Sequence, residues 1–108
     1  MKKVFISMPM NGKSRKEIEQ MQDDILISVC NKLNEKIEHI ESYLDNDLSP
    51  LGCLAENLKR MSTADYVVFV EGWQNARGCI IERLCAERYG FEIIDVKPVI
   101  KEDINNGD

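Results

Sequence analysis

The chain has 108 residues, which is enough for one domain with its own hydrophobic core and too few for two. Its 14 basic and 19 acidic side chains give a net charge of -5, which argues against binding to a nucleic-acid polymer or adsorption to a membrane. No apolar run approaches the roughly 20 residues that span a bilayer, and the first residues lead into a strand pattern instead of a signal peptide, so we expect a cytoplasmic protein.

The first elements predicted in chain order are a buried strand and a long helix. Residues 3–8, KVFISM, are apolar and rich in strand formers, and a turn-prone loop follows at residues 9–12. Ser14 and Glu17 form a capping-box pattern that predicts a helix over residues 14–35. The apolar residues of this helix recur at helical spacing: Ile18, Met21, Ile25, Val29 and Leu33.

The middle of the chain is predicted to hold a short strand and a second helix. Residues 36–44 could extend the first helix or form an edge strand, and we expect the strand because a βαβ crossover requires one. Ser49 followed by Pro50 marks the start of the next helix. Its expected buried stripe consists of Leu51, Leu54, Leu58 and Met61.

The last third repeats the alternation of strand and helix. An apolar strand at residues 66–70 leads through the polar loop WQNARG into a helix over about residues 78–89, which Gly90 ends, and a strand follows at residues 91–96. The expected buried residues of this helix are Ile81, Leu84 and Cys85.

The alternation predicts an α/β fold, a flavodoxin-like or Rossmann-like three-layer sandwich with a parallel sheet of four to five strands in the order 2-1-3-4. Residues 1–100 would form this single domain, and residues 101–108 a polar tail.

In such a sheet, ligands bind beyond the carboxyl ends of the strands, at the switch point between the first and third strands. The loops that follow these two strands should therefore face each other across a small-molecule site. The candidate binding residues are Ser7, Met8, Pro9, Met10, Gly12, Gly72, Trp73, Asn75, Arg77 and Gly78.

Glu82 is the candidate catalytic residue. It lies close to the start of the third predicted helix, where the positive dipole end favours an ionised carboxylate, so we expect an anion there. Inside a pocket, such a group could attack an electrophilic carbon, stabilise a developing positive charge or bind sugar hydroxyls. The alternative is that Glu82 merely favours the helix start.

Two neighbours of Glu82 also have two interpretations each. Arg77 could hold a 5′-phosphate or pair with Glu71 or Glu82, and Trp73 could stack on a base or fill a gap between subunits.

Three aspartates outside these loops are weaker candidates. Asp45 or Asp47 could reach the pocket or remain solvated in a turn. Asp65 should lie at the opposite edge of the sheet.

The four cysteines have no CxxC spacing and are expected to be reduced, with only Cys79 close enough to the loop to touch a ligand. The single histidine, His39, is expected to be solvated, and no set of ligands at usable spacing predicts a metal. We expect no cofactor.

Two segments, VFISMPMNG at residues 4–12 and ADYVVFVEGWQNARGCIIERLCAERYG at residues 64–90, resemble the nucleoside 2-deoxyribosyltransferase superfamily, especially its small uncharacterised branch. Trp73, Arg77, Gly78 and Glu82 match the W-x-x-S-R-G-x-x-x-E segment of that branch. The resemblance implies a flavodoxin-like fold, assembly into homo-oligomers and cleavage of the N-glycosidic bond of a nucleoside or nucleotide. It also implies that Glu82 is the nucleophile that forms a glycosyl-enzyme.

One departure from the family keeps other functions open. Active transferases carry an aspartate six residues before the nucleophile, and this chain has Ala76 there, while the amide of the adjacent Asn75 cannot protonate a leaving base. The alternatives are a non-catalytic protein that binds or senses a nucleotide, and a structural domain whose loop holds no ligand.

Overall fold

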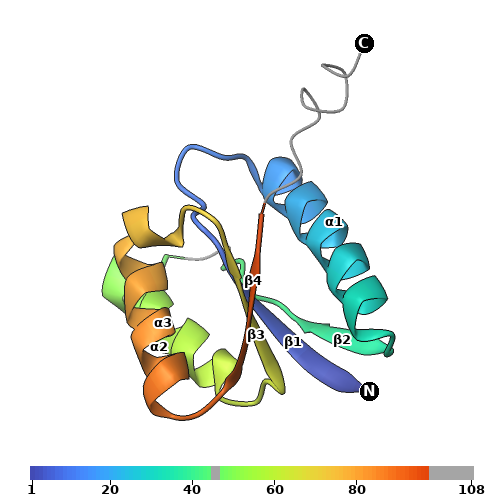
Figure 1. The fold of residues 1–108 in the computed structure, drawn as a ribbon. Coiled ribbons are helices and arrows are strands. Elements are labelled where there is room, and N and C mark those ends of the chain that lie inside the picture. Colours follow the sequence, from blue (N-terminus) through green and yellow to red (C-terminus); the bar gives the residue numbers. More distant parts are fainter. Residues whose placement is uncertain (45–46, 98–108) are drawn as a thin grey trace.

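A computed structural model of the protein describes residues 1–44 and 47–97 and contains a four-stranded parallel sheet with helices on both faces (Figure 1). The strands are β1 (Lys2–Ser7), β2 (Ile37–Ile40), β3 (Tyr66–Val70) and β4 (Glu92–Val96), in the order β2-β1-β3-β4. The helices are α1 (Arg15–Leu33), α2 (Pro50–Met61) and α3 (Arg77–Arg88), and a short 3-10 turn, η1 (Trp73–Asn75), precedes α3. The predicted α/β class and strand order are confirmed, while residues 101–108 lie outside the described residues.

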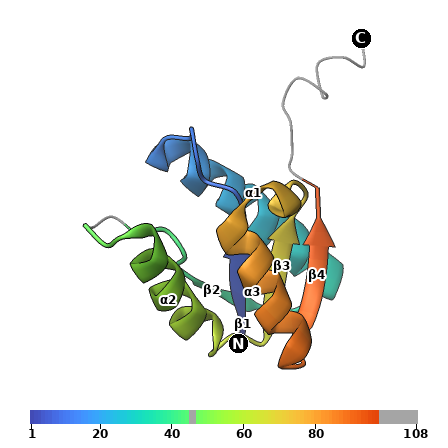
Figure 2. The ribbon, with the colours of Figure 1, turned by 90° about the vertical axis from the view of Figure 1, so that its left-hand side faces the viewer.

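Helix α1 covers one face of the sheet, and α2 and α3 cover the other (Figures 1 and 2). Successive strand residues point to opposite faces, so each strand contributes to two cores. Val4 and Ile6 pack with Ile25 and Val29 of α1. On the other face, Phe5 belongs to a cluster with Val67, Phe69, Met61 and Ala86.

Helix α1 begins as its sequence predicts. The Ser14 side chain accepts a hydrogen bond from the Glu17 backbone N–H at 3.1 Å, and the Glu17 carboxylate accepts one from the Ser14 N–H at 3.2 Å. This capping box satisfies two backbone donors that would otherwise be unpaired. Ile18, Ile25 and Val29 are buried, as predicted from the helical spacing.

The predicted buried faces of α2 and α3 are wrong in part. Leu51 is 74% exposed and Leu84 is 50% exposed. Ile81 is also exposed, and α3 instead buries Cys79, Glu82 and Ala86. The reason is that apolar residues occur on more than one side of α3, so the pattern alone does not fix which side meets the sheet.

His39 and the cysteines differ in how well they match expectation. His39, expected to be solvated, is half-buried on β2, and burial lowers the pKa of its imidazole, opposed by the charges of Glu41 and Asp23. All four cysteines are free thiols.

Within residues 1–44 and 47–97, no helix is long and apolar enough to cross a membrane, and no three His, Cys, Asp or Glu side chains are grouped to hold a metal.

Two isoleucines on α1 test the assigned core. Ile25 is 2% exposed and Ile27 is 61% exposed. We expect Ile25→Ala to lower the free energy of unfolding by about 2–5 kcal/mol, because it removes buried hydrocarbon and leaves a cavity. Ile27→Ala is the matched control and should change it by less than about 0.5 kcal/mol. Urea unfolding measures both, and equal losses would contradict the packing of α1.

Candidate functional site

A crevice of about 360 Å³ lies where the loop after β1, the start of α3 and one side of α2 meet. It is at the carboxyl end of β1, next to β3, which is the predicted switch point of the sheet. The predicted site residues that line it are Ser7, Met8, Pro9, Met10, Asn75, Arg77, Gly78 and Glu82. The structure therefore brings together residues from two loops that are far apart in the sequence.

Three predicted site residues do not line this crevice. Gly12 and Gly72 have φ values of 78° and 103°, a backbone conformation that favours glycine, so their evident role is to form turns. Trp73 lines a separate hollow of about 370 Å³ together with Phe69 and Arg83. Asp95 and Val96 of β4 line the same hollow, so the indole lies at the β4 edge of the sheet and not in the crevice that holds Glu82.

The wall formed by α2 was missed from the sequence. Pro50, Cys53, Leu54 and Asn57 line the crevice at the spacing of one helix face. The spacing of these four residues could have revealed the wall from the sequence. The prediction missed it because it placed Leu51 in the buried stripe, so it oriented a different face of α2 toward the core. Other lining residues that were not predicted are Phe5, Ile6, Asn11, Ser42 and Ala76.

Glu82 is buried at the centre of the site. Its side chain comes from α3, is 6% exposed and accepts a hydrogen bond from Ser7 Oγ at 2.6 Å. Ser7 is the last residue of β1 and is itself 2% exposed. The bond therefore joins the end of β1 to α3, the helix that follows β3.

The expectation that Glu82 is a simple anion is wrong. Burial raises the pKa of its carboxyl group to about 7, although the Ser7 hydrogen bond lowers it. Helix α3 begins at Arg77, so Glu82 lies in the second turn, and the dipole effect fades within the first. Desolvation therefore outweighs the dipole, and Glu82 is only partly ionised near neutral pH.

Cys79 lies beside this pair and lines the crevice, as expected. The expectation that no other cysteine comes close to a ligand is wrong, because Cys53 of α2 also lines the crevice. Cys79 is 5% exposed. Burial raises the pKa of its thiol, as does the charge of Glu82, and a hydrogen bond with Ser7 opposes them. A thiol held in its protonated form is a poor nucleophile, so Glu82 is the better candidate for chemistry.

Arg77 is the cationic residue of the crevice lining among the described residues, and its side chain is exposed. Within the described part of the chain, it forms an ion pair with neither Glu71 nor Glu82. Its guanidinium is thus available to an anionic group of a ligand, as one of its two predicted roles requires.

The remaining candidates lie elsewhere. Asp65 accepts a hydrogen bond from the Lys3 N–H at 2.8 Å at the amino end of the sheet, as expected. Asp47 is exposed and does not line the crevice, and Asp45 lies outside the described residues.

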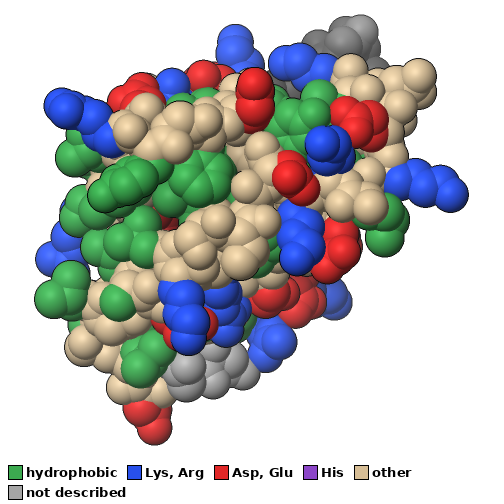
Figure 3. All heavy atoms as spheres, turned by 90° about the horizontal axis from the view of Figure 1, so that it is seen from below, with side chains coloured by type: hydrophobic (Ala, Val, Ile, Leu, Met, Phe, Trp, Pro, Cys, Tyr) green, Lys and Arg blue, Asp and Glu red, His purple; other side chains and the backbone are tan. Residues whose placement is uncertain are grey.

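Figure 3 views the molecule from the amino-end side, where acidic and basic side chains are interspersed and hydrophobic ones gather toward the side of α2 and α3.

Arg83 fixes the turn that leads into α3. Its guanidinium lies 5.0 Å from the centroid of the Phe69 ring and 4.9 Å from that of Trp73. It also donates hydrogen bonds to Asp95 at 2.5 Å and Glu87 at 3.2 Å. These contacts hold η1 against the ends of β3 and β4, and η1 in turn carries Asn75 into the crevice.

Comparison with models of known protein families gives no match for this sequence. A comparison with curated proteins also finds none.

The raised pKa of Glu82 predicts a specific dependence of stability on pH. The unfolded carboxyl ionises near pH 4.5 and the folded one near 7, so the folded state binds the proton more tightly between these values. The contribution of Glu82 to stability is therefore fully present below pH 4.5 and is lost as pH rises to 7. The Glu82→Gln variant should therefore become more stable relative to wild type as pH rises. We expect the difference between their free energies of unfolding to grow by on the order of 2–3 kcal/mol from pH 4.5 to 8.

Urea unfolding at several pH values measures this difference. Glu38→Gln, a change at an exposed position of β2, is the control and should leave the profile parallel to that of wild type. A parallel profile for Glu82→Gln would mean that the Glu82 carboxyl is not desolvated.

Trp73 is the single tryptophan, so its fluorescence reports on the Arg83 contacts. We expect Arg83→Met to shift the emission to longer wavelength and to increase quenching by acrylamide, because the indole loses its cationic neighbour and becomes more accessible. The free energy of unfolding should fall by about 1–3 kcal/mol. Arg88→Met, an exposed change on the same helix, should leave the emission unchanged. An identical spectrum for both variants would contradict the role of Arg83.

Proposed function

We propose that the protein cleaves the N-glycosidic bond of a nucleoside or nucleotide, as a hydrolase or a deoxyribosyltransferase, with Glu82 as the nucleophile. The observation that carries the proposal is the position of Glu82, a buried carboxyl group lining a crevice at the carboxyl end of β1. The sequence resemblance assigns the same residue to the same role.

The chemistry fits a single carboxylate with a hydroxyl partner. An ionised Glu82 attacks the anomeric carbon as the bond to the base nitrogen breaks, and the transition state has oxocarbenium character that the negative charge stabilises. Water or a second base then attacks the same carbon, releases the sugar from Glu82 and restores the original configuration. Ser7 Oγ, 2.6 Å from Oε1, orients the carboxylate for the attack.

The departing base also has to be considered. Among the described residues that line the crevice, Glu82 is the one carboxyl group, and the asparagine amides beside it are not acids. Protonation of the base therefore falls to water. The proposal is therefore limited to nucleobases that can leave without being protonated by an acidic side chain.

A non-catalytic nucleotide binder is the second candidate. Ala76 lines the crevice at the position where the resemblance expects an aspartate, and the raised pKa of Glu82 reduces the share of ionised nucleophile near neutral pH. The same crevice with Arg77 at its edge would then hold a nucleotide without cleaving it.

The exposed apolar side chains of α2 and α3 support the homo-oligomer that the resemblance implies. Leu51, Ile80, Ile81 and Leu84 are all at least 39% exposed, and they lie on the same layer of the molecule. An apolar surface of this kind is typical of a protein interface. Self-association through it remains part of the proposal.

Incubation of the pure protein with each deoxynucleoside and its 5′-monophosphate tests the enzyme. We expect release of free base, measured by chromatography, and we expect Glu82→Ala to reduce the rate by at least 100-fold because the nucleophile is lost. Glu71→Ala, a change at an exposed carboxylate outside the crevice, is the matched control and should keep the activity. Binding of these compounds without any release of base would favour the non-catalytic protein instead.

A further inference from the structure

Asn57 stands out in the crevice because one of its polar atoms is unsatisfied. Its side chain belongs to the α2 wall of the crevice. Its Oδ1 is shielded from solvent and has no hydrogen-bond partner within the described residues. A buried carbonyl without a donor destabilises the folded state, and native proteins contain few such groups.

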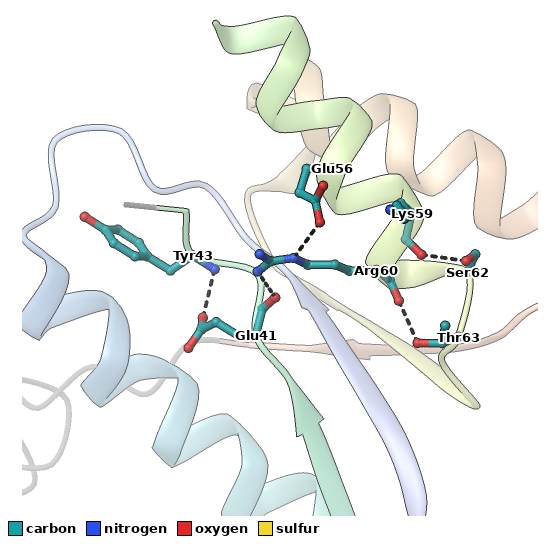
Figure 4. Close-up of polar contacts among 7 residues, drawn as sticks. All are labelled: Glu41, Tyr43, Glu56, Lys59, Arg60, Ser62 and Thr63. Atoms are coloured by element: carbon teal, nitrogen blue, oxygen red, sulfur yellow. Dashed lines mark hydrogen bonds and ion pairs between the residues drawn. The ribbon is translucent and has the colours of Figure 1, made fainter. Parts of the chain in front are cut away.

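The wall that carries Asn57 is fixed on the side facing β2 (Figure 4). Arg60, one turn further along α2, donates a hydrogen bond to the Glu41 carbonyl at 2.8 Å and one to Glu56 at 3.1 Å. The bond to Glu41 ties α2 to the segment that follows β2, whereas the bond to Glu56 lies within α2 and orients the Arg60 side chain. Arg60 and Asn57 lie one turn apart, so the bond to Glu41 anchors the part of α2 that carries Asn57.

The next residue of that segment, Ser42, gives this part of the crevice a second fixed polar group. Ser42 is 2% exposed and lines the crevice, and its Oγ accepts a hydrogen bond from the buried Gln22 side chain at 3.1 Å. The hydroxyl keeps its own hydrogen to donate. An acceptor and a donor are thus both present on the side of the crevice formed by α2 and the end of β2.

We propose that Asn57 is a ligand-contacting residue whose side-chain carbonyl accepts a hydrogen bond from an N–H or O–H group of the bound ligand. This inference rests on the proposed function only in taking the crevice as the ligand site. Oδ1 has no accessible surface in the structure, so the proposal requires the amide to rotate about its terminal torsion, which is a soft one, when the ligand binds. The ligand class is a compound with a hydrogen-bond donor, such as the amino group of a base or a sugar hydroxyl.

Asn57→Leu separates this role from a structural one. Leucine has a similar shape and no polar atom, so removal of the unsatisfied carbonyl should keep the melting temperature or raise it by roughly 4 °C. The affinity for 2′-deoxyadenosine and its 5′-monophosphate, measured by calorimetry, should fall by about tenfold. Asn31→Leu, the same change at an exposed position of α1, should leave the affinity unchanged. Asn57→Ala provides a second variant, with circular dichroism to establish that each protein is folded.

The outcomes distinguish this proposal from the enzymatic one. Weaker binding by a folded Asn57 variant supports the role of Asn57, whether or not wild type releases base. Unchanged affinity in both variants overturns it, as does a lower melting temperature without loss of affinity, even if Glu82-dependent release of base is observed. If wild type binds neither probe, the crevice is not a nucleoside site and both proposals fail.

Discussion

The hydrogen bond between Ser7 and Glu82 is the contact around which the site is organised. Ser7 ends β1 and Glu82 lies in the second turn of α3, so the bond connects two central elements across 75 positions of sequence. A carboxyl group buried at 6% exposure needs such a partner, because water no longer solvates it. Cys79 and Ala86 are buried together with Glu82, so this side of α3 meets the sheet and Ile81 and Leu84 are left exposed.

The same burial creates a conflict between stability and chemistry at Glu82. Desolvation favours the neutral carboxyl, whereas the proposed attack on an anomeric carbon requires the carboxylate. A carboxyl group with a perturbed pKa in a crevice is a candidate for a functional residue. Asn57 shows a related cost on the opposite wall, where a carbonyl is buried without a donor.

Much of the fold could be predicted because its signals are local. The capping box at Ser14, the proline that follows Ser49 and the apolar runs of the strands each depend on neighbouring residues, and the handedness of βαβ crossovers then favours the strand order that is observed. The faces of the short helices could not be predicted in this way. α3 carries Ile80, Ile81 and Leu84 beside Cys79 and Glu82, so two different sides of the helix have apolar residues.

The sequence by itself determined the parallel α/β sheet, the loop after β1 and the presence of Glu82 near the start of a helix, since these follow from periodicity, capping and turn residues. Tertiary structure alone decided that Glu82 is buried against Ser7, that Trp73 packs beneath Arg83 outside the crevice, and that α2 supplies a wall with Asn57. The physical reason is that solvation and contact depend on how separate elements pack together. Neither quantity is encoded in the spacing of residues along one element.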